Sequence, residues 1–177
     1  MTINIRSFTN AFLDRITPGH RVLDLGAGDG KFAHMFSECG AIVTVVDTQA
    51  PKFQDAKITV KKMKIEDFCA INGTGHYDLI FARNVIQFLD KNWVFETLFP
   101  WMDRHSTQQG IIAIETFYQD PKPPFKHFMR SLYTLQELTE YFIMWKELYT
   151  KEYSHNGLDI SGQTRKFFVS SLIVQKK

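Results

Sequence analysis

Eleven residues decide the fold of this chain: Val22-Leu23-Asp24-Leu25-Gly26-Ala27-Gly28-Asp29-Gly30-Lys31-Phe32. An apolar strand ends in an acid, glycines follow at alternating positions, and a helix then begins. Because glycine has no Cβ, the backbone at Gly26, Gly28 and Gly30 can turn sharply and approach a ligand closely. Such a loop at the carboxyl end of a first strand is typical of a nucleotide-type site in an α/β sheet.

The spacing of these glycines separates two kinds of site. A dinucleotide fingerprint reads G-x-G-x-x-G and places a pyrophosphate at a helix N-terminus. Here the third glycine comes one residue early, and Lys31 stands where the last glycine is expected. Asp24 and Asp29 also bring negative charge, which disfavours an anionic ligand. The loop therefore favours a ligand with an ammonium group and no phosphate, such as S-adenosylmethionine, over a nicotinamide dinucleotide.

The composition is that of an ordinary globular domain. The 177 residues are 44% hydrophobic and 23% charged, which predicts a single domain over residues 1–177. A formal net charge of +2 does not indicate a dedicated nucleic-acid binder. No apolar stretch approaches the roughly 20 residues that span a bilayer. With no signal-peptide pattern and with Cys39 and Cys69 as isolated thiols, we expect a cytoplasmic protein. The six scattered histidines predict no metal site.

Strand and helix patterns alternate along the chain, which predicts a doubly wound, Rossmann-like α/β sheet. We expect strands over 21–25, 41–47, 58–64, 77–82 and 110–116, and helices over 6–16, 30–38, 91–104 and 135–142. The helix 91–104 is expected to kink at Pro100, and Thr134 with Glu137 has capping-box spacing. The last segment reads as a hairpin of strands 145–153 and 166–175 around an Asn156-Gly157 turn, adding one antiparallel strand.

Acids follow the second and third strands. Asp47 lies 21 residues after Gly26, beside Thr48, and its carboxylate can accept hydrogen bonds from both ribose hydroxyls. The alternative is a strand-ending aspartate that caps the next turn. In Ile65-Glu66-Asp67-Phe68, Asp67 can accept from an adenine amino group while Phe68 or Ile65 packs on the ring, or the same residues can be an N-cap and a core aromatic.

Two residues after the fourth strand are candidates for the amino-acid end of such a ligand. Asn84 can contact it through its side chain or backbone, and Arg83 can pair with a carboxylate. Both residues can equally be ordinary loop positions.

Taken together, the order Asp24-x-Gly26-x-Gly28-x-Gly30, Asp47, Asp67 and Tyr77–Asn84 resembles the class I S-adenosylmethionine-dependent methyltransferases. The resemblance covers most of the chain and implies a seven-stranded sheet of order 3-2-1-4-5-7-6 with S-adenosylmethionine as cofactor. The cofactor-binding residues it implies are Asp24, Gly26, Ala27, Gly28, Gly30, Asp47, Thr48, Glu66, Asp67, Phe68, Arg83 and Asn84.

Within that family the chain is most similar to small methyltransferases of the tellurite-resistance protein B type. Pro123-Pro124-Phe125, the helix 135–142 with Trp145, and the terminal strand ending in Lys176-Lys177 carry this likeness. It implies a small acceptor, a thiol or a selenium or tellurium oxyanion, and a basic and histidine cluster in the final hairpin. His155 and Arg165, with Lys166, lie near the corresponding positions without matching the register.

The sequence indicates less about how the acceptor is bound and activated than about the cofactor. Glu115 and Tyr118, at the end of the fifth strand, are candidates to assist an acceptor, although Glu115 can equally be a structural acid paired with a cation. The absence of a clear base leaves a second possibility, a regulatory module that binds S-adenosylmethionine or S-adenosylhomocysteine without turnover. Arg83-Asn84-Val85-Ile86 lacks the Pro-Pro-aromatic pattern of base-amino methyltransferases, which argues against DNA-adenine methylation. The loop 118–131 is either a lid or a solvated connector.

Overall fold

A computed structural model describes residues 3–49, 53–71, 75–119, 129–158 and 162–177. They form one seven-stranded sheet in the order β3-β2-β1-β4-β5-β7-β6. The strands are β1 (Arg21–Leu25), β2 (Ile42–Val46), β3 (Ile58–Lys61), β4 (Tyr77–Arg83), β5 (Ser106–Gln119), β6 (Lys146–Leu158) and β7 (Thr164–Gln175). β1 to β5 pair in parallel, and β7 is antiparallel to both β5 and β6. The expected order and hairpin are therefore confirmed.

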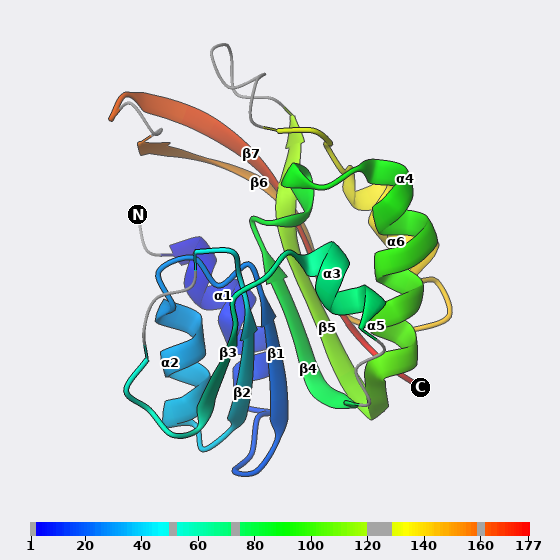
Figure 1. Cartoon of the computed structure of the whole chain (residues 1–177). Coiled ribbons are helices and arrows are strands. Elements are labelled where there is room, and N and C mark those ends of the chain that lie inside the picture. Colours follow the sequence, from blue (N-terminus) through cyan, green and yellow to red (C-terminus); the bar gives the residue numbers. More distant parts are fainter. Residues whose placement is uncertain (1–2, 50–52, 72–74, 120–128, 159–161) are drawn as a thin grey trace.

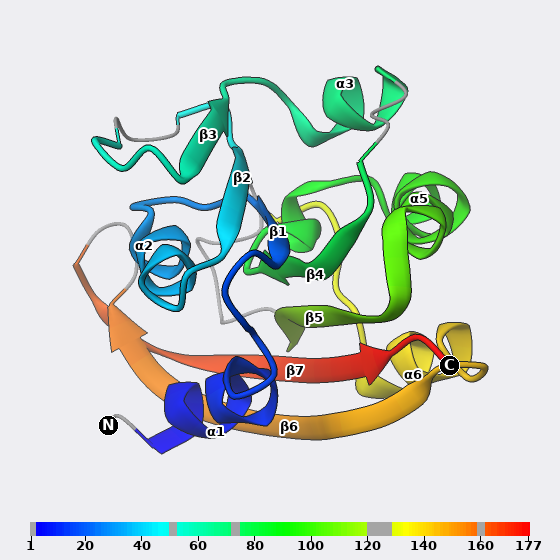
Figure 2. The ribbon, with the colours of Figure 1, turned by 90° about the horizontal axis from the view of Figure 1, so that it is seen from below.

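Helices cover both faces of the sheet. They are α1 (Ile3–Leu13), α2 (Lys31–Glu38), α3 (Ile65–Ala70), α4 (Lys91–Trp93), α5 (Phe99–His105) and α6 (Leu135–Tyr141). Figure 2 shows α1 and α2 on one side of the sheet and α3, α5 and α6 on the other. In Figure 1, the far ends of β6 and β7 curve away from the parallel strands, on the same side as α1.

The central strand β4 is buried on both faces. Leu79 and Phe81 pack into the apolar cluster under α1 and α2, whereas Ile80 and Ala82 pack into the cluster under α3, α5 and α6. This near-continuous apolar run is the pattern of a parallel strand covered by helices. It fixes the carboxyl end of β4, from which Arg83 and Asn84 project, against the end of β1.

The sequence predicts a kink of the helix at Pro100. In the structure, the helical run 91–105 changes its winding just before this residue. A π-type turn, Val94–Leu98, separates α4 from α5. Proline lacks an N–H and its ring collides with the carbonyl four residues earlier, and a wider turn relieves both problems.

The prediction of a turn at Asn156-Gly157 is wrong. Both residues belong to β6, where Asn156 pairs with Lys166 and Gly157 with Arg165. A Cβ at Gly157 would lie 3.1 Å from the Phe167 ring, so the glycine accommodates an aromatic side chain of the next strand. The left-handed conformation belongs to Gly162, with φ of 79°, while residues 159–161 lie outside the described part of the chain.

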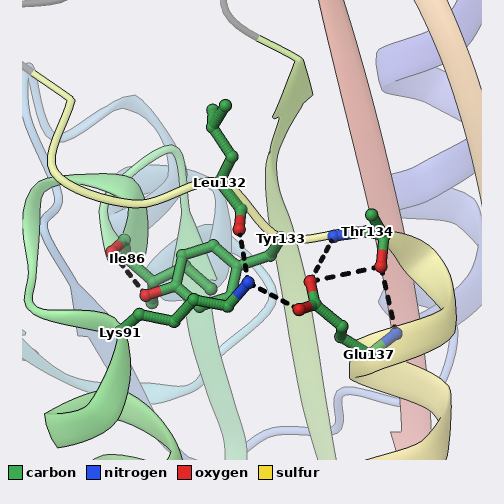
Figure 3. Close-up of polar contacts among 6 residues, drawn as sticks. All are labelled: Ile86, Lys91, Leu132, Tyr133, Thr134 and Glu137. Atoms are coloured by element: carbon green, nitrogen blue, oxygen red, sulfur yellow. Dashed lines mark hydrogen bonds and ion pairs between the residues drawn. The ribbon is translucent and has the colours of Figure 1, made fainter.

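A polar cluster fixes the segment after β4 to the start of α6 (Figure 3). The Lys91 Nζ donates to the Leu132 carbonyl at 3.0 Å and pairs with Glu137 Oε1 at 2.6 Å. The buried Tyr133 hydroxyl donates to the Ile86 carbonyl at 3.2 Å, and burial raises the pKa of Tyr133 to about 12. Glu137 also closes the predicted capping box with Thr134. Tyr133 thus holds the start of the segment 86–89, which borders the site described next, and Lys91 holds the chain just after that segment.

Within the described residues, we find no helix whose length and apolar character would allow it to cross a membrane.

Candidate functional site

The glycine loop adopts the conformation that its sequence predicts. Gly26, Gly28 and Gly30 have φ of 72°, 55° and 79°, a left-handed region in which side chains are strained. A Cβ at Gly26 would lie 2.4 Å from Val85 Cγ2, so this glycine permits close packing of the loop on the segment after β4. A Cβ at Gly28 would meet nothing within 4 Å, because Gly28 faces open space. Gly30 is the N-cap of α2.

Asp47 joins the end of β2 to this loop. Its Oδ2 accepts a hydrogen bond from the Gly28 N–H at 3.0 Å, and its Oδ1 accepts one from the Gln49 N–H at 2.7 Å. Each carboxylate oxygen has capacity for a further donor. The capping role and the ligand role considered for Asp47 are therefore compatible in one side chain.

Two neighbouring cavities lie along the carboxyl ends of β1, β2 and β4. The larger one measures about 500 Å³ and the smaller one about 280 Å³. Gly26, Gly28 and Asn84 line both. The larger cavity adds Asp47, Thr48 and Glu66 from the predicted set, and the smaller adds Asp24, Ala27 and Arg83. This is the place at which open α/β sheets bind their ligands.

The lining of the smaller cavity includes two buried acceptors that lack a donor. Asp24 Oδ2 and Asn84 Oδ1 have no hydrogen-bond partner among the described residues. Asn84 has a left-handed backbone, with φ of 51°, and its N–H donates to the Glu115 carbonyl at 2.7 Å. Burial, together with the charges of Asp47 and Asp29, raises the pKa of Asp24 to about 7. Unpaired buried acceptors are costly, so this wall is suited to a ligand that carries donors and positive charge.

Arg83 supplies the opposite charge in the smaller cavity. Its Nε donates to Glu115 Oε1 at 2.7 Å, and its guanidinium lies 5.1 Å from the centre of the Phe32 ring. A guanidinium carries five N–H donors. The smaller cavity therefore combines a buried acid, Asp24, with a held cation, Arg83, which matches the two charges of an amino acid.

Only some of the α3 residues that the sequence predicts as ligand contacts line the larger cavity. Ile65 and Glu66 line the larger cavity, whereas Asp67 is exposed and is not a lining residue. The prediction for Phe68 needs correction: the ring is 8% exposed and packs on Trp101 at 5.6 Å, within the core. In a helix, side chains three or four positions apart share a face, so Ile65, Phe68 and Cys69 point inward together.

None of the acceptor-side candidates is among the described residues that line either cavity. Glu115, 1% exposed, accepts from Arg83, from the Tyr153 hydroxyl at 2.9 Å and from the Ser171 hydroxyl at 3.2 Å. The structural role considered for Glu115, an acid paired with a cation, is the one that this geometry supports. Tyr118 packs edge-on against Phe168, with ring centres 5.8 Å apart.

The two candidates of the hairpin lie on facing strands, two register positions apart, because His155 pairs with Phe167 and Arg165 pairs with Gly157. His155 stacks on Phe167 at 5.6 Å, and its buried Nδ1 has no partner among the described residues. Arg165 donates to Gln163 at 3.0 Å. Most of the loop 118–131, with Pro123-Pro124-Phe125, lies outside the described residues, so its role as a lid stays a prediction.

Sequence reasoning missed much of the cavity wall. In the larger cavity the additional lining residues are Val46, Met63, Lys64, Val85, Phe88, Leu89 and Arg130. In the smaller cavity they are Asp29, Lys31, Phe32 and Phe81. Phe32 and Lys31 directly follow the glycine loop, a position that could have indicated them. The described residues hold no group of acids, cysteines and histidines suited to a metal ion.

Comparison with known proteins identifies what this arrangement resembles. A family model described as a methyltransferase domain matches residues 3–155. No curated protein sequence matches the chain. The fold is similar to that of TehB from Haemophilus influenzae, with a TM-score of 0.75 and 23% identity over 97% of this chain and 62% of that one. The present chain thus spans less than two thirds of the length of that protein.

Two further solved structures share the fold. One is the 1,6-didemethyltoxoflavin-N1-methyltransferase of Burkholderia thailandensis, with bound 1,6-didemethyltoxoflavin and S-adenosylhomocysteine. It is 15% identical, has a TM-score of 0.70, and is matched over 99% of this chain and 79% of that one. The other is the N-methyltransferase NodS of Bradyrhizobium japonicum in complex with S-adenosylhomocysteine. It is 12% identical, with a TM-score of 0.69, over 98% of this chain and 85% of that one.

Proposed function

Because the chain belongs to the methyltransferase domain family, we propose that residues 1–177 form one domain that transfers a methyl group from S-adenosylmethionine to a small acceptor. The observation that carries this proposal is the pair of cavities joined at Gly26, Gly28 and Asn84. The larger cavity has a strand-ending acid for ribose hydroxyls and apolar walls for a base. The smaller one has the charges for an amino acid. Two of the solved structures that share the fold contain bound S-adenosylhomocysteine.

The buried acceptors of the site fit this cofactor, and this fit does not depend on the comparisons with known proteins. Asp24 Oδ2 and Asn84 Oδ1 are buried acceptors without donors, and an ammonium group supplies N–H donors with a positive charge. Arg83 would meet the carboxylate, and Asp47 the ribose hydroxyls. Gly28 leaves open space where any other residue would place a side chain.

When bound, S-adenosylmethionine supplies a methyl group on a positively charged sulfur, and this sulfur keeps the electron pair of the broken sulfur–carbon bond while the acceptor's lone pair forms the new bond. The protein's part is to hold donor and acceptor in line and to exclude water, and alignment of this kind contributes roughly 7–11 kcal/mol. The segment that carries the cavity-lining Phe88 and Leu89 is held at both ends for that task. The Tyr133 hydroxyl donates to the Ile86 carbonyl (Figure 3), and the Ser131 hydroxyl donates to the Leu89 carbonyl.

For the acceptor we propose a soft nucleophile, a small thiol or a selenium or tellurium oxyanion. Glu115 is already occupied by three donors, and none of the four acceptor-side candidates lines either described cavity. A thiol ionises near pH 8.5 and so needs little help from a base at neutral pH. The similarity to a methyltransferase that binds the small molecule 1,6-didemethyltoxoflavin supports a small acceptor.

Ligand-induced thermal stabilisation tests the cofactor. Any ligand that binds only the folded state raises the melting temperature by mass action. We expect S-adenosylmethionine and S-adenosylhomocysteine to raise it and NAD to leave it unchanged. Stabilisation by NAD alone, or by none of the three, would overturn the proposal.

A turnover assay tests the acceptor class. With tellurite, selenite, small thiols and small amines as separate acceptors, we expect S-adenosylhomocysteine to form with a thiol or an oxyanion. Turnover with amines alone contradicts the acceptor proposal. Tight cofactor binding without turnover on any acceptor would instead favour the regulatory module.

A further inference from the structure

A chain of hydrogen bonds leads from the smaller cavity into the sheet. Arg83 lines the cavity and donates through Nε to Glu115 Oε1 at 2.7 Å. Glu115 Oε2 in turn accepts from the Tyr153 hydroxyl of β6 at 2.9 Å and from the Ser171 hydroxyl of β7 at 3.2 Å. Neither Glu115, Tyr153 nor Ser171 is among the described residues that line the cavity. The cavity-lining cation is therefore oriented by groups that a ligand does not touch.

The burial of the pair makes the orientation strict. The side chains of Arg83 and Glu115 are 23% and 1% exposed, so water competes little for the shared hydrogen bond. Phe32 covers one face of the guanidinium at 5.1 Å, which leaves Glu115 to fix the rotation about the side-chain axis. Both hydroxyl donors come from the hairpin strands, 38 and 56 residues away in sequence from Glu115.

We propose that Tyr153 is a positioning residue: through Glu115 it aims the Arg83 guanidinium at the carboxylate of the cofactor's amino-acid end. The inference rests on the proposed function and deepens it, because it assigns recognition of that carboxylate to the β6–β7 hairpin. Burial, together with the Glu115 carboxylate, raises the pKa of Tyr153, so its hydroxyl remains a donor throughout the neutral range. The hairpin thereby helps to distinguish ligands with an amino-acid end from those without one.

Two ligands separate this role from a general effect on the fold. S-adenosylhomocysteine carries the amino-acid end, whereas 5′-methylthioadenosine has the same adenosine and sulfur but no carboxylate. Titration calorimetry of Tyr153→Phe is expected to show affinity for S-adenosylhomocysteine falling about 3- to 10-fold, the range of one hydrogen bond. Affinity for 5′-methylthioadenosine should stay within about twofold of the wild type. Ser171→Ala should likewise lower the affinity for S-adenosylhomocysteine relative to the affinity for 5′-methylthioadenosine.

The matched control is Tyr149→Phe. Tyr149 lies on the same strand, and its hydroxyl hydrogen-bonds with Ser7 of α1 at 3.3 Å rather than with Glu115. In Tyr149→Phe, the ratio of the affinities for S-adenosylhomocysteine and 5′-methylthioadenosine should equal that of the wild type. A second comparison repeats Tyr153→Phe in an Arg83→Gln background, where it should have no further effect on S-adenosylhomocysteine, because the group it positions is gone.

The outcomes are distinct. Equal losses for both ligands, no loss for either, or an undiminished effect in the Arg83→Gln background overturn the positioning role. Failure of the wild-type protein to bind either ligand overturns the proposed function itself.

Discussion

The Gly28 N–H donates to Asp47 Oδ2 across 3.0 Å, joining the glycine loop of β1 to the end of β2. This single bond places a carboxylate beside Gly28, where a Cβ would meet nothing within 4 Å. Because Asp47 also accepts from the Gln49 N–H, its orientation is fixed by two backbone donors before any ligand arrives. The larger cavity is therefore preorganised for a ligand that offers hydroxyl donors.

Replacing Asp47 with alanine should weaken cofactor binding strongly and keep the fold. The carboxylate is expected to accept hydrogen bonds from ribose hydroxyls, and a charge-assisted bond contributes about 1.5–3 kcal/mol, or roughly 10- to 100-fold in affinity. The backbone donors that Asp47 would leave lie in an exposed part of the loop, where water can satisfy them. Calorimetric titration with S-adenosylhomocysteine measures the loss. Gln49→Ala is the control, because Gln49 meets Asp47 only through its backbone, and similar losses in both variants would contradict the assignment.

Gly26 and Gly28 should respond differently to the same substitution. Gly26→Ala is expected to lower the free energy of unfolding by about 2–4 kcal/mol, because its Cβ would lie 2.4 Å from Val85 Cγ2 in a strained conformation. Gly28→Ala is expected to cost only about 1–2 kcal/mol, from the backbone strain alone, and to weaken cofactor binding, because its Cβ enters the cavity. Urea unfolding and calorimetry of both variants measure the two effects.

Adding Val85→Ala separates the causes. It should restore part of the stability lost in Gly26→Ala and none of the binding lost in Gly28→Ala, since only the first variant meets Val85. Equal stability losses in the two glycine variants would contradict the steric account.

The features that the sequence predicts correctly depend on neighbouring residues. The strand that carries Asp24, the three glycines and the acid at Asp47 are read from spacing alone, and the structure brings them to one edge of the sheet. The capping box of Thr134 and Glu137 is equally local. In each case the residues that determine the conformation lie within a few positions of it.

The features that the sequence misses depend on distant residues. The sequence leaves Glu115 open between a catalytic and a structural acid, because Tyr153 and Ser171, whose hydroxyls bind its carboxylate, come from another part of the chain. Asn156-Gly157 resembles a turn, but the ring of Phe167 on the next strand requires the glycine instead. Phe88 and Leu89 reach the larger cavity because segment 129–133 holds them, through bonds such as that from the Ser131 hydroxyl to the Leu89 carbonyl at 2.9 Å.

Lys91→Ala should lower stability and remove part of its dependence on pH. Burial opposes ionisation of Glu137, but the Lys91 and Thr134 hydrogen bonds outweigh it and lower the Glu137 pKa. A lowered pKa contributes stability that is present above the unfolded value of 4.5 and lost as the pH falls through the folded one. Since both side chains are 37% exposed, solvent screening limits the effect to about 1 kcal/mol at pH 7. Urea unfolding between pH 3 and 7 measures it.

Lys62→Ala, at an exposed position outside this cluster, is the control for Lys91→Ala. If the two variants lose the same stability, or if Lys91→Ala keeps the wild-type pH profile, the pairing with Glu137 contributes nothing.

Ionisation of the Asp24 carboxyl should make the stability of the ligand-free protein and the affinity for the cofactor change with pH in opposite directions. Its pKa is raised to about 7, mainly by burial, so the ligand-free protein should become more stable as the pH falls from about 7 toward 4. A cationic ligand favours the ionised carboxylate, so affinity for S-adenosylmethionine should fall over that same range, by up to about tenfold per pH unit. Asp24→Asn should flatten both profiles, bind weakly throughout and unfold at a higher temperature at pH 8. Parallel thermal-unfolding and calorimetric series measure the two curves, and a wild-type affinity that does not change between pH 8 and 5.5 would exclude Asp24 as the partner of the ligand's positive charge.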